Sequence, residues 1–457
     1  MQFLYHSIPS EVNPFWARFC SVGMAALPPL YICLTPSALF IRILPIMNQR
    51  SFTPEEKKVA IKLMRREVWV DKLRLLAIFM VVCCHCCDPF TFNPDPAVSN
   101  NPAFGFWGAV YQAFLRPCVP LFACMTGLLL LPVKQEMVAF YKKRISRVLW
   151  PFLIWSALYA LFPVIVFACG GSKELIISFF VNEQNPSPAL GDALLSMCRI
   201  PFDFTLYSVH MWFVFLIIGL YLYLPIFSAW LEKATLREKH LVLGIWGITL
   251  CIPYAEMFTP QLFGTCSWNS FGMLYYFGGF IGYLLLGHLV QKEWQPRSWG
   301  RTLALAVPAF IIGCVATFAG YRLIQTGAIS CDLPISGKLA MAFNPLQAGL
   351  PYEASHELCL LYCTPNVALM VWAILIVFRK LNTAELRTRA VLANLTACGF
   401  GIYLVHYLFV GPANMLINLI GVPMPLVILC SGVLAFLVTW CVVMLLRKGI
   451  KGTWFLG

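Results

Sequence analysis

Long apolar stretches recur along this chain and restrict its fold more than any other feature of the sequence. Ten of them approach or exceed the roughly 20 residues that an α-helix needs to cross a bilayer, at 71–90, 105–132, 148–169, 206–230, 241–257, 271–290, 302–321, 356–378, 390–411 and 422–446. Of the 457 residues, 60% are hydrophobic and 12% are charged, whereas soluble domains carry about 25% charged residues. The sequence therefore predicts an all-α integral membrane protein, a bundle of about ten transmembrane helices.

Basic residues are distributed unevenly between the connections that join these stretches. Alternate connections carry clusters of Lys and Arg, whereas the connections on the other side carry only Lys173, Arg199, Arg322 and Lys338. The positive-inside rule assigns the basic side to the cytoplasm, which predicts that both ends of the bundle are cytoplasmic. This distribution also accounts for the net charge of +13, so we expect membrane lipids as partners and no nucleic acid.

The first apolar stretch, VDKLRLLAIFMVVCCHCCDPF at 70–90, contains ionisable residues that are costly in lipid. Arg74 and His85 are eleven residues apart, which places them on one helix face with an axial separation of roughly 16 Å. Asp71 and Asp88 extend the same stripe by one turn at each end. Ionisable residues inside a span usually face the bundle interior and mark a functional path. Two plainer interpretations stay open: a His–Asp pair that only locks helix packing, and an arginine that snorkels to the interface.

Nineteen cysteines are present, and most of them lie inside apolar runs. There we expect them to pack as small apolar side chains. The cysteines around His85 are one or two residues away from it in the sequence, so on a helix they point elsewhere and cannot chelate a metal together with it. We therefore expect no metal site.

Several short motifs, taken together in their order, resemble membrane acyltransferase family 3. The first motif lies in the first span, where Arg74 and His85 are separated by ten residues. Its end, HCCDPF at 85–90, resembles the family branch that contains the enterobacterial common antigen O-acetyltransferase. The others are RPCVPLF at 116–122 followed by TG at 126–127, KRISR at 143–147 followed by Pro151 and Trp155, HMWFV at 210–214, GLYLYLP at 219–225, YFGGF at 276–280 and GIYLVH at 401–406. The resemblance covers about 68–457, a ten-helix acyltransferase domain preceded by an extension at 1–67 that ends in a basic cytoplasmic segment.

The resemblance implies transfer of an acyl group, usually acetyl, from cytoplasmic acyl-CoA to a sugar hydroxyl of a cell-surface glycan or a lipid-linked precursor. The protein would be a multi-pass enzyme of the bacterial plasma membrane with no permanently bound cofactor. The expected donor-binding residues are Arg74, Arg144 and Arg147, because guanidinium groups suit phosphate. Alternatively, the pair at 144 and 147 serves only as a topology signal that contacts lipid head groups.

His85 and Asp88 are the expected catalytic pair. An imidazole titrates near neutrality and suits a general base that takes a proton from a hydroxyl, while the family also suggests that His85 carries the acyl group transiently. Four further residues would line an outward cavity that binds the acceptor or stabilises the oxyanion: Arg116, His210, Trp212 and His406. The interfacial aromatic belt is the plainer interpretation of Trp212. Glu353 and His356 would also face this cavity.

A transporter or glycan flippase that uses the stripe of Arg74, His85 and Asp88 is the main alternative function. Transporters often show two related halves or paired broken helices, and the sequence shows neither. A third interpretation is a partner in glycan assembly or export that has no chemistry of its own. Direct measurement of acyl transfer separates these functions.

Residues 1–46 have no counterpart in the resemblance. A start at Met47 or Met64 would leave the short N-terminal segment before the first span that is usual in the family. We therefore expect the mature chain to begin at one of these two methionines. N-terminal sequencing of the expressed protein tests this prediction, and a mature chain that retains residues 1–46 would contradict it.

Overall fold

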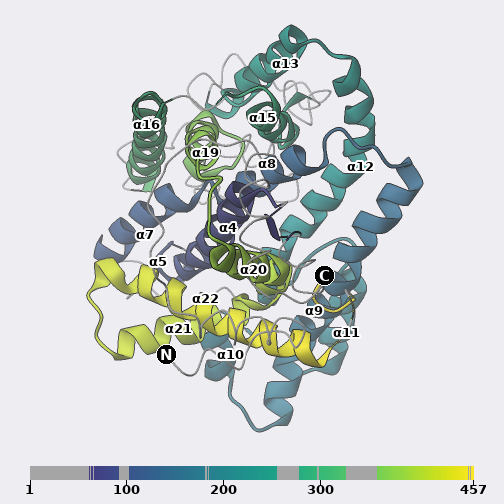
Figure 1. The fold of residues 1–457 in the computed structure, drawn as a ribbon. Helices are drawn as coiled ribbons and strands as arrows, with labels where there is room; N and C mark the ends of the chain where they lie inside the picture. Colours follow the sequence, from purple (N-terminus) through teal and green to yellow (C-terminus); the bar gives the residue numbers. More distant parts are fainter. Residues whose placement is uncertain are drawn as a thin grey trace, which may run out of the picture.

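The computed structural model describes residues 61, 63–64, 66–91, 102–180, 183, 185–254, 277–295, 298–325, 358–450, 452 and 454–457. Within these ranges all regular structure is helical (Figure 1). The elements are α4 (Val68–Cys86), α5 (Asp88–Thr91), α7 (Pro102–Leu115), α8 (Cys118–Leu130), α9 (Met137–Ala168), α10 (Lys173–Phe179), α11 (Leu190–Arg199), η2 (Leu206–Met211), α12 (Trp212–Lys233), α13 (Leu236–Thr249), α15 (Ile281–Lys292), α16 (Trp299–Gln325), η7 (Leu358–Leu360), α19 (Pro365–Phe378), α20 (Leu386–Val405), α21 (Tyr407–Leu419) and α22 (Met424–Gly449).

Seven helices in the described ranges are long and apolar enough to cross a membrane, and they fall on seven of the ten predicted stretches. This confirms a multi-pass helical membrane protein. Of the other three stretches, the first is α4, which has 19 residues but carries Asp71, Lys72 and Arg74 near its start. The stretches at 241–257 and 271–290 lie partly outside the described residues. The number of ten spans and the cytoplasmic placement of both ends stay predictions.

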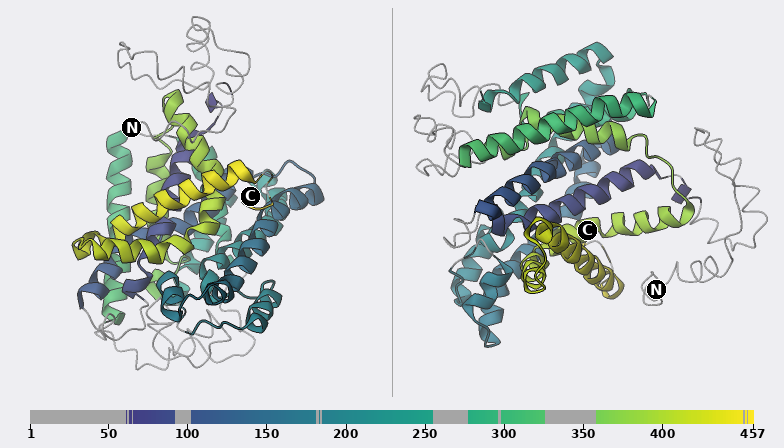
Figure 2. Two further views of the ribbon diagram at one scale, coloured as in Figure 1. Left: turned by 90° about the horizontal axis from the view of Figure 1, so that it is seen from below. Right: turned by 90° about the vertical axis from the view of Figure 1, so that its left-hand side faces the viewer.

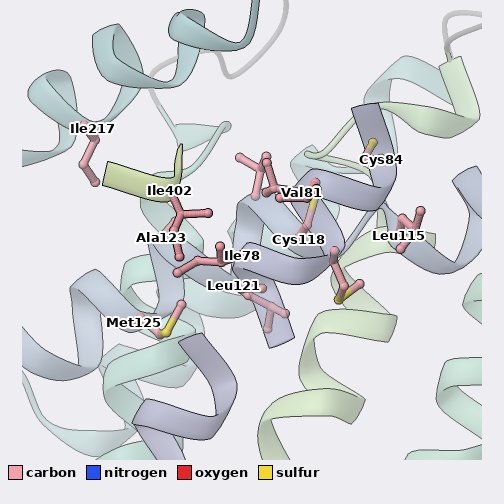
Figure 3. Packing of buried hydrophobic residues seen from close by; sticks show 14 of the residues in the cluster. Ile78, Val81, Cys84, Leu115, Cys118, Leu121, Ala123, Met125, Ile217 and Ile402 are labelled. Carbon is pink, nitrogen blue, oxygen red and sulfur yellow. The ribbon is translucent and has the colours of Figure 1, made fainter. Parts of the chain in front are cut away.

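Helix α4 is the central element of the bundle. It packs against α7, α8, α19, α20, α21 and α22, and these helices surround it in Figure 1. Helix α16 packs alongside α19, on the side of α19 that faces away from α4, as the right-hand view of Figure 2 shows. A helix buried on several sides needs an apolar surface on more than one face. Accordingly, Ile78, Val81 and Cys84 of α4 lie in one buried cluster with residues of α8 (Figure 3).

Two predicted spans are broken, and each break has a local cause. Between α7 and α8 the break falls at Arg116-Pro117, because proline has no amide hydrogen to continue the helix ladder. The stretch predicted at 390–411 is divided between two helices: α20 ends at Val405, and α21 starts at Tyr407. Here the His406 side chain contacts the helix's own carbonyl oxygens: its Nδ1 lies 2.7 Å from Tyr403 O and 3.2 Å from Ile402 O. A side chain inserted into the ladder bends a helix.

Helices α8 and α15 approach each other through glycine on both sides. A Cβ at Gly127 of α8 would overlap the main-chain oxygen of Leu284, and a Cβ at Gly287 of α15 would overlap that of Cys124. Small residues allow such close packing in membranes, where van der Waals contact replaces the hydrophobic driving force between helices. The α8–α15 contact therefore depends on the absence of two side chains.

Replacing Gly287 by alanine should force α8 and α15 apart and destabilise the bundle by about 1–3 kcal/mol or more, the usual cost of overpacking. Thermal unfolding of the purified protein in detergent measures this loss. Gly244→Ala in α13 is the matched control, because a Cβ there meets no atom within 4 Å. Equal stability of the two variants would refute the proposed contact.

Candidate functional site

His85 lies in the last turn of α4, and Asp88 begins the short helix α5 that follows it. The Nδ1 atom of His85 is 3.2 Å from Oδ2 of Asp88. A carboxylate only accepts hydrogen bonds, so Nδ1 carries the hydrogen and Nε2 of the neutral ring keeps a free lone pair. The His85 side chain is 19% exposed, which leaves an edge of this otherwise enclosed ring accessible.

Two further histidines approach His85 from other parts of the chain. The ring centroid of His406 is 5.3 Å from that of His85, and the ring of His210 is 6.1 Å from it. The rings of His210 and His406 are 5.0 Å apart. We call these three residues the imidazole cluster. They come from the end of α4, from η2 just before α12, and from the break between α20 and α21.

Tyrosines surround the imidazole cluster and fix the backbone that carries it. The hydroxyl of Tyr403 donates to the carbonyl oxygen of His210 at 2.6 Å, and that of Tyr159 donates to Leu404 O at 2.8 Å. The Tyr407 ring lies 5.2 Å from His85 and 4.9 Å from His210. These contacts hold α9, η2 and the α20–α21 break together around one point, so the positions of the histidines depend on tertiary structure.

Arg116 and Trp212 meet through a residue that the sequence analysis did not single out, Tyr362. The Nη1 atom of Arg116 donates to the Tyr362 hydroxyl at 3.2 Å, and the guanidinium also lies 5.4 Å from the ring centroid. The Trp212 ring stacks on the Tyr362 ring, with 5.6 Å between the ring centroids and an interplanar angle of 22°. Trp212 follows His210 by two residues in the chain. A cation and an aromatic pair therefore adjoin the imidazole cluster.

Cations gather near the other end of α4. Arg74 of α4 and Arg144 and Arg147 of α9 all lie within electrostatic range of the Tyr221 hydroxyl on α12. Arg144 also lies over the Phe140 ring, 6.0 Å from its centroid. We call Arg74, Arg144 and Arg147 the arginine cluster. It joins residues that are about seventy positions apart in the sequence.

Asp71 does not cancel the charge of this cluster, because another arginine already binds it. Arg66 forms two hydrogen bonds to its carboxylate, at 2.6 and 2.7 Å, whereas the nearest nitrogen of Arg74 is 3.8 Å away. The Thr396 hydroxyl adds a third hydrogen bond at 3.1 Å. The bonds to Asp71 raise the pKa of the Arg66 guanidinium above its ordinary value. Arg74 is thus only partly neutralised.

The structure sorts the predicted site residues into two groups. His85, Asp88, His210 and His406 lie together, with Arg116 and Trp212 beside them, and the arginine cluster forms the second group. Glu353 and His356 lie outside the described residues. The missed residues are tyrosines at 159, 221, 362, 403 and 407. Tyr221 and Tyr403 lie in the motifs GLYLYLP and GIYLVH, and Tyr403 also precedes His406 by three positions and so shares its helix face.

The fold and these groups define a multi-pass membrane protein whose central helix carries an enclosed imidazole site near its end and a basic site near its start. The model of the family described as an acyltransferase domain matches residues 67–444. The chain therefore belongs to acyltransferase family 3, and its membership supports a membrane acyltransferase. No curated protein and no solved structure matched the chain.

Proposed function

We propose that this protein is a membrane O-acyltransferase of the bacterial plasma membrane. It moves an acyl group, with acetyl the first candidate, from cytoplasmic acyl-CoA to a hydroxyl of a cell-surface glycan or its lipid-linked precursor. This is the activity of the enterobacterial common antigen O-acetyltransferase branch, which the HCCDPF motif resembles. The observation that carries the proposal is the placement of the arginine cluster and the imidazole cluster near opposite ends of one helix, α4.

The His85–Asp88 pair supports a base at Nε2. Because Nδ1 donates to Asp88, Nε2 is the atom that takes the proton from the acceptor hydroxyl as its oxygen attacks the thioester carbon. Asp88 stabilises the imidazolium that results, and this proton then passes to the departing thiolate. If His85 instead carries the acyl group, the same Nε2 attacks the thioester. Both routes require the tautomer that the Asp88 contact favours.

The arginine cluster supports an anionic donor. Each guanidinium can bond two phosphate oxygens in its plane, and CoA carries several phosphates. Since Asp71 is engaged chiefly by Arg66, the Arg74 guanidinium is only partly neutralised and stays suited to such a ligand. The Tyr221 hydroxyl, which lies within electrostatic range of all three, adds a polar group near them. The neutral acyl end of the donor then lies toward the interior.

Arg116 supports the polar transition state on the acceptor side. A guanidinium near the reacting carbonyl stabilises the negative oxygen that develops there. Its hydrogen bond to Tyr362 fixes its direction. The stacked Trp212 and Tyr362 rings offer apolar faces next to this charge, which suits the C–H face of a sugar.

His85→Ala should lower transfer of radioactive acetyl from acetyl-CoA to membrane glycan by about 10²–10⁴-fold, the usual contribution of a general base. His240→Ala is the control, because His240 is an exposed histidine of α13 and contributes nothing to the site. Label transfer in isolated membranes is the measurement. Unchanged transfer in the His85 variant would remove this residue from the mechanism, and substrate uptake or flipping without acyl transfer would favour the transporter.

Arg144→Gln or Arg147→Gln should raise the KM for acetyl-CoA about tenfold or more while changing kcat less. The reason is that a hydrogen bond to a charged group contributes about 1.5–3 kcal/mol, and 1.4 kcal/mol is a factor of ten in affinity. Steady-state kinetics with varied acetyl-CoA test this. Arg237→Gln on α13 removes the same charge from an exposed position, and a similar rise in KM there would reveal a nonspecific effect of charge.

A further inference from the structure

Three buried nitrogen atoms of the imidazole cluster form no hydrogen bond of good geometry with the residues that the structure describes, although His210 lies near the backbone of Leu404. They are Nδ1 and Nε2 of His210 and Nε2 of His406. His210 is 2% exposed and His406 is fully buried. Buried polar atoms without a partner are rare in native proteins, and each needs an explanation such as a ligand or ordered water. All three belong to rings whose centroids lie within 6.1 Å of His85.

The hydrogen-bonding character of His406 follows from its neighbours. Its Nδ1 contacts two carbonyl oxygens, of Tyr403 at 2.7 Å and of Ile402 at 3.2 Å. Carbonyl oxygens only accept, so Nδ1 carries the hydrogen and Nε2 of the neutral ring is an acceptor. The ring therefore has the same tautomer as His85. Two neighbouring imidazoles thus each present an Nε2 lone pair, and neither lone pair can satisfy the other.

We propose that these two nitrogen atoms bind two different hydroxyl groups of the acyl acceptor, so that His406 selects sugars that carry a second hydroxyl close to the one that reacts. This inference rests on the proposed function and narrows its acceptor. A hydroxyl has a single hydrogen to donate, so one hydroxyl cannot satisfy both lone pairs. The hydroxyl at His85 reacts, and a second hydroxyl, one or two carbons away on the same molecule, donates to Nε2 of His406. His406 thus determines specificity, while His85 takes the proton.

Charge and burial support this division of roles. Of the three histidines, His85 is the one that the described residues pair with a carboxylate, that of Asp88. A positive charge is therefore stabilised on His85 rather than on the other two rings. His210 offers one donor and one acceptor whichever tautomer it adopts, and these also suit a hydroxyl. His85 is 19% exposed whereas His406 is fully buried. The second hydroxyl is accordingly the deeper one, and it meets uncharged ring nitrogens.

The first test maps the acetyl groups that the wild-type protein adds to its own glycan, by mass spectrometry and NMR of the isolated polymer. We expect every acetylated carbon to have a free hydroxyl on the next carbon or the next but one. An acetyl group on a position without such a neighbour would overturn the proposal. This experiment uses the native membrane and needs no added acceptor.

The second test compares transfer from acetyl-CoA to a methyl glycoside and to its monodeoxy analogue that lacks the second hydroxyl. We expect the wild-type protein to prefer the parent glycoside at least tenfold, because a site built to bond a hydroxyl rejects an analogue without it. His406→Asn should abolish the preference, since its amide nitrogen can still donate to the carbonyls that Nδ1 contacts but nothing replaces Nε2. His406→Phe removes both functions and reports the structural role.

Two results would overturn the inference: equal use of both glycosides by the wild-type protein, or a preference that survives in His406→Asn. Either would mean that water satisfies Nε2 or that His406 only shapes the helix break. Failure of the proposed function is a separate result. It is measured by the effect of His85→Ala on acetyl transfer to native glycan, without any glycoside probe.

Discussion

Lipid offers no hydrogen-bond partners, and this constraint governs how the polar residues of α4 are arranged. A polar side chain in a span is costly unless it finds a partner inside the protein. Asp71 is accordingly held by Arg66 and Thr396 near the start of the helix, and His85 contacts Asp88 at its end. Helices α7, α8, α19, α20, α21 and α22 pack against α4, so these groups face protein. The central position of α4 is therefore a consequence of its sequence.

The breaks in two helices coincide with polar residues of the candidate site. The break at Arg116-Pro117 places a buried guanidinium against Tyr362. The break at His406 makes two carbonyl oxygens partners of an imidazole. In each case an interruption of the span coincides with a polar residue beside His85.

Much of this arrangement could be predicted from the sequence because hydropathy and helical spacing are local properties. The helical class, seven of the stretches and the contact between His85 and Asp88 follow from such local rules. The approach of His210 and His406 to His85 does not, because it depends on how α12 and α20 pack against α4. The break at Val405 was also missed, since the apolar run continues through it and the cause is a side-chain hydrogen bond. The tyrosines were not predicted as site residues, even where a motif contains them, because aromatic residues are common in any span.

The separation of the two clusters along α4 follows from the cost of moving charge into lipid. A charged group is costly at the bilayer centre, and phosphates would carry several charges. In the proposed function, the arginine cluster near the start of α4 keeps the phosphates at the membrane surface, where water and counterions also reach them. The thioester is neutral, so it can enter the protein toward His85 at much smaller cost. In this proposal one helix, α4, positions both the arginines that hold the charged phosphates at the surface and the histidine at which the acyl group is transferred.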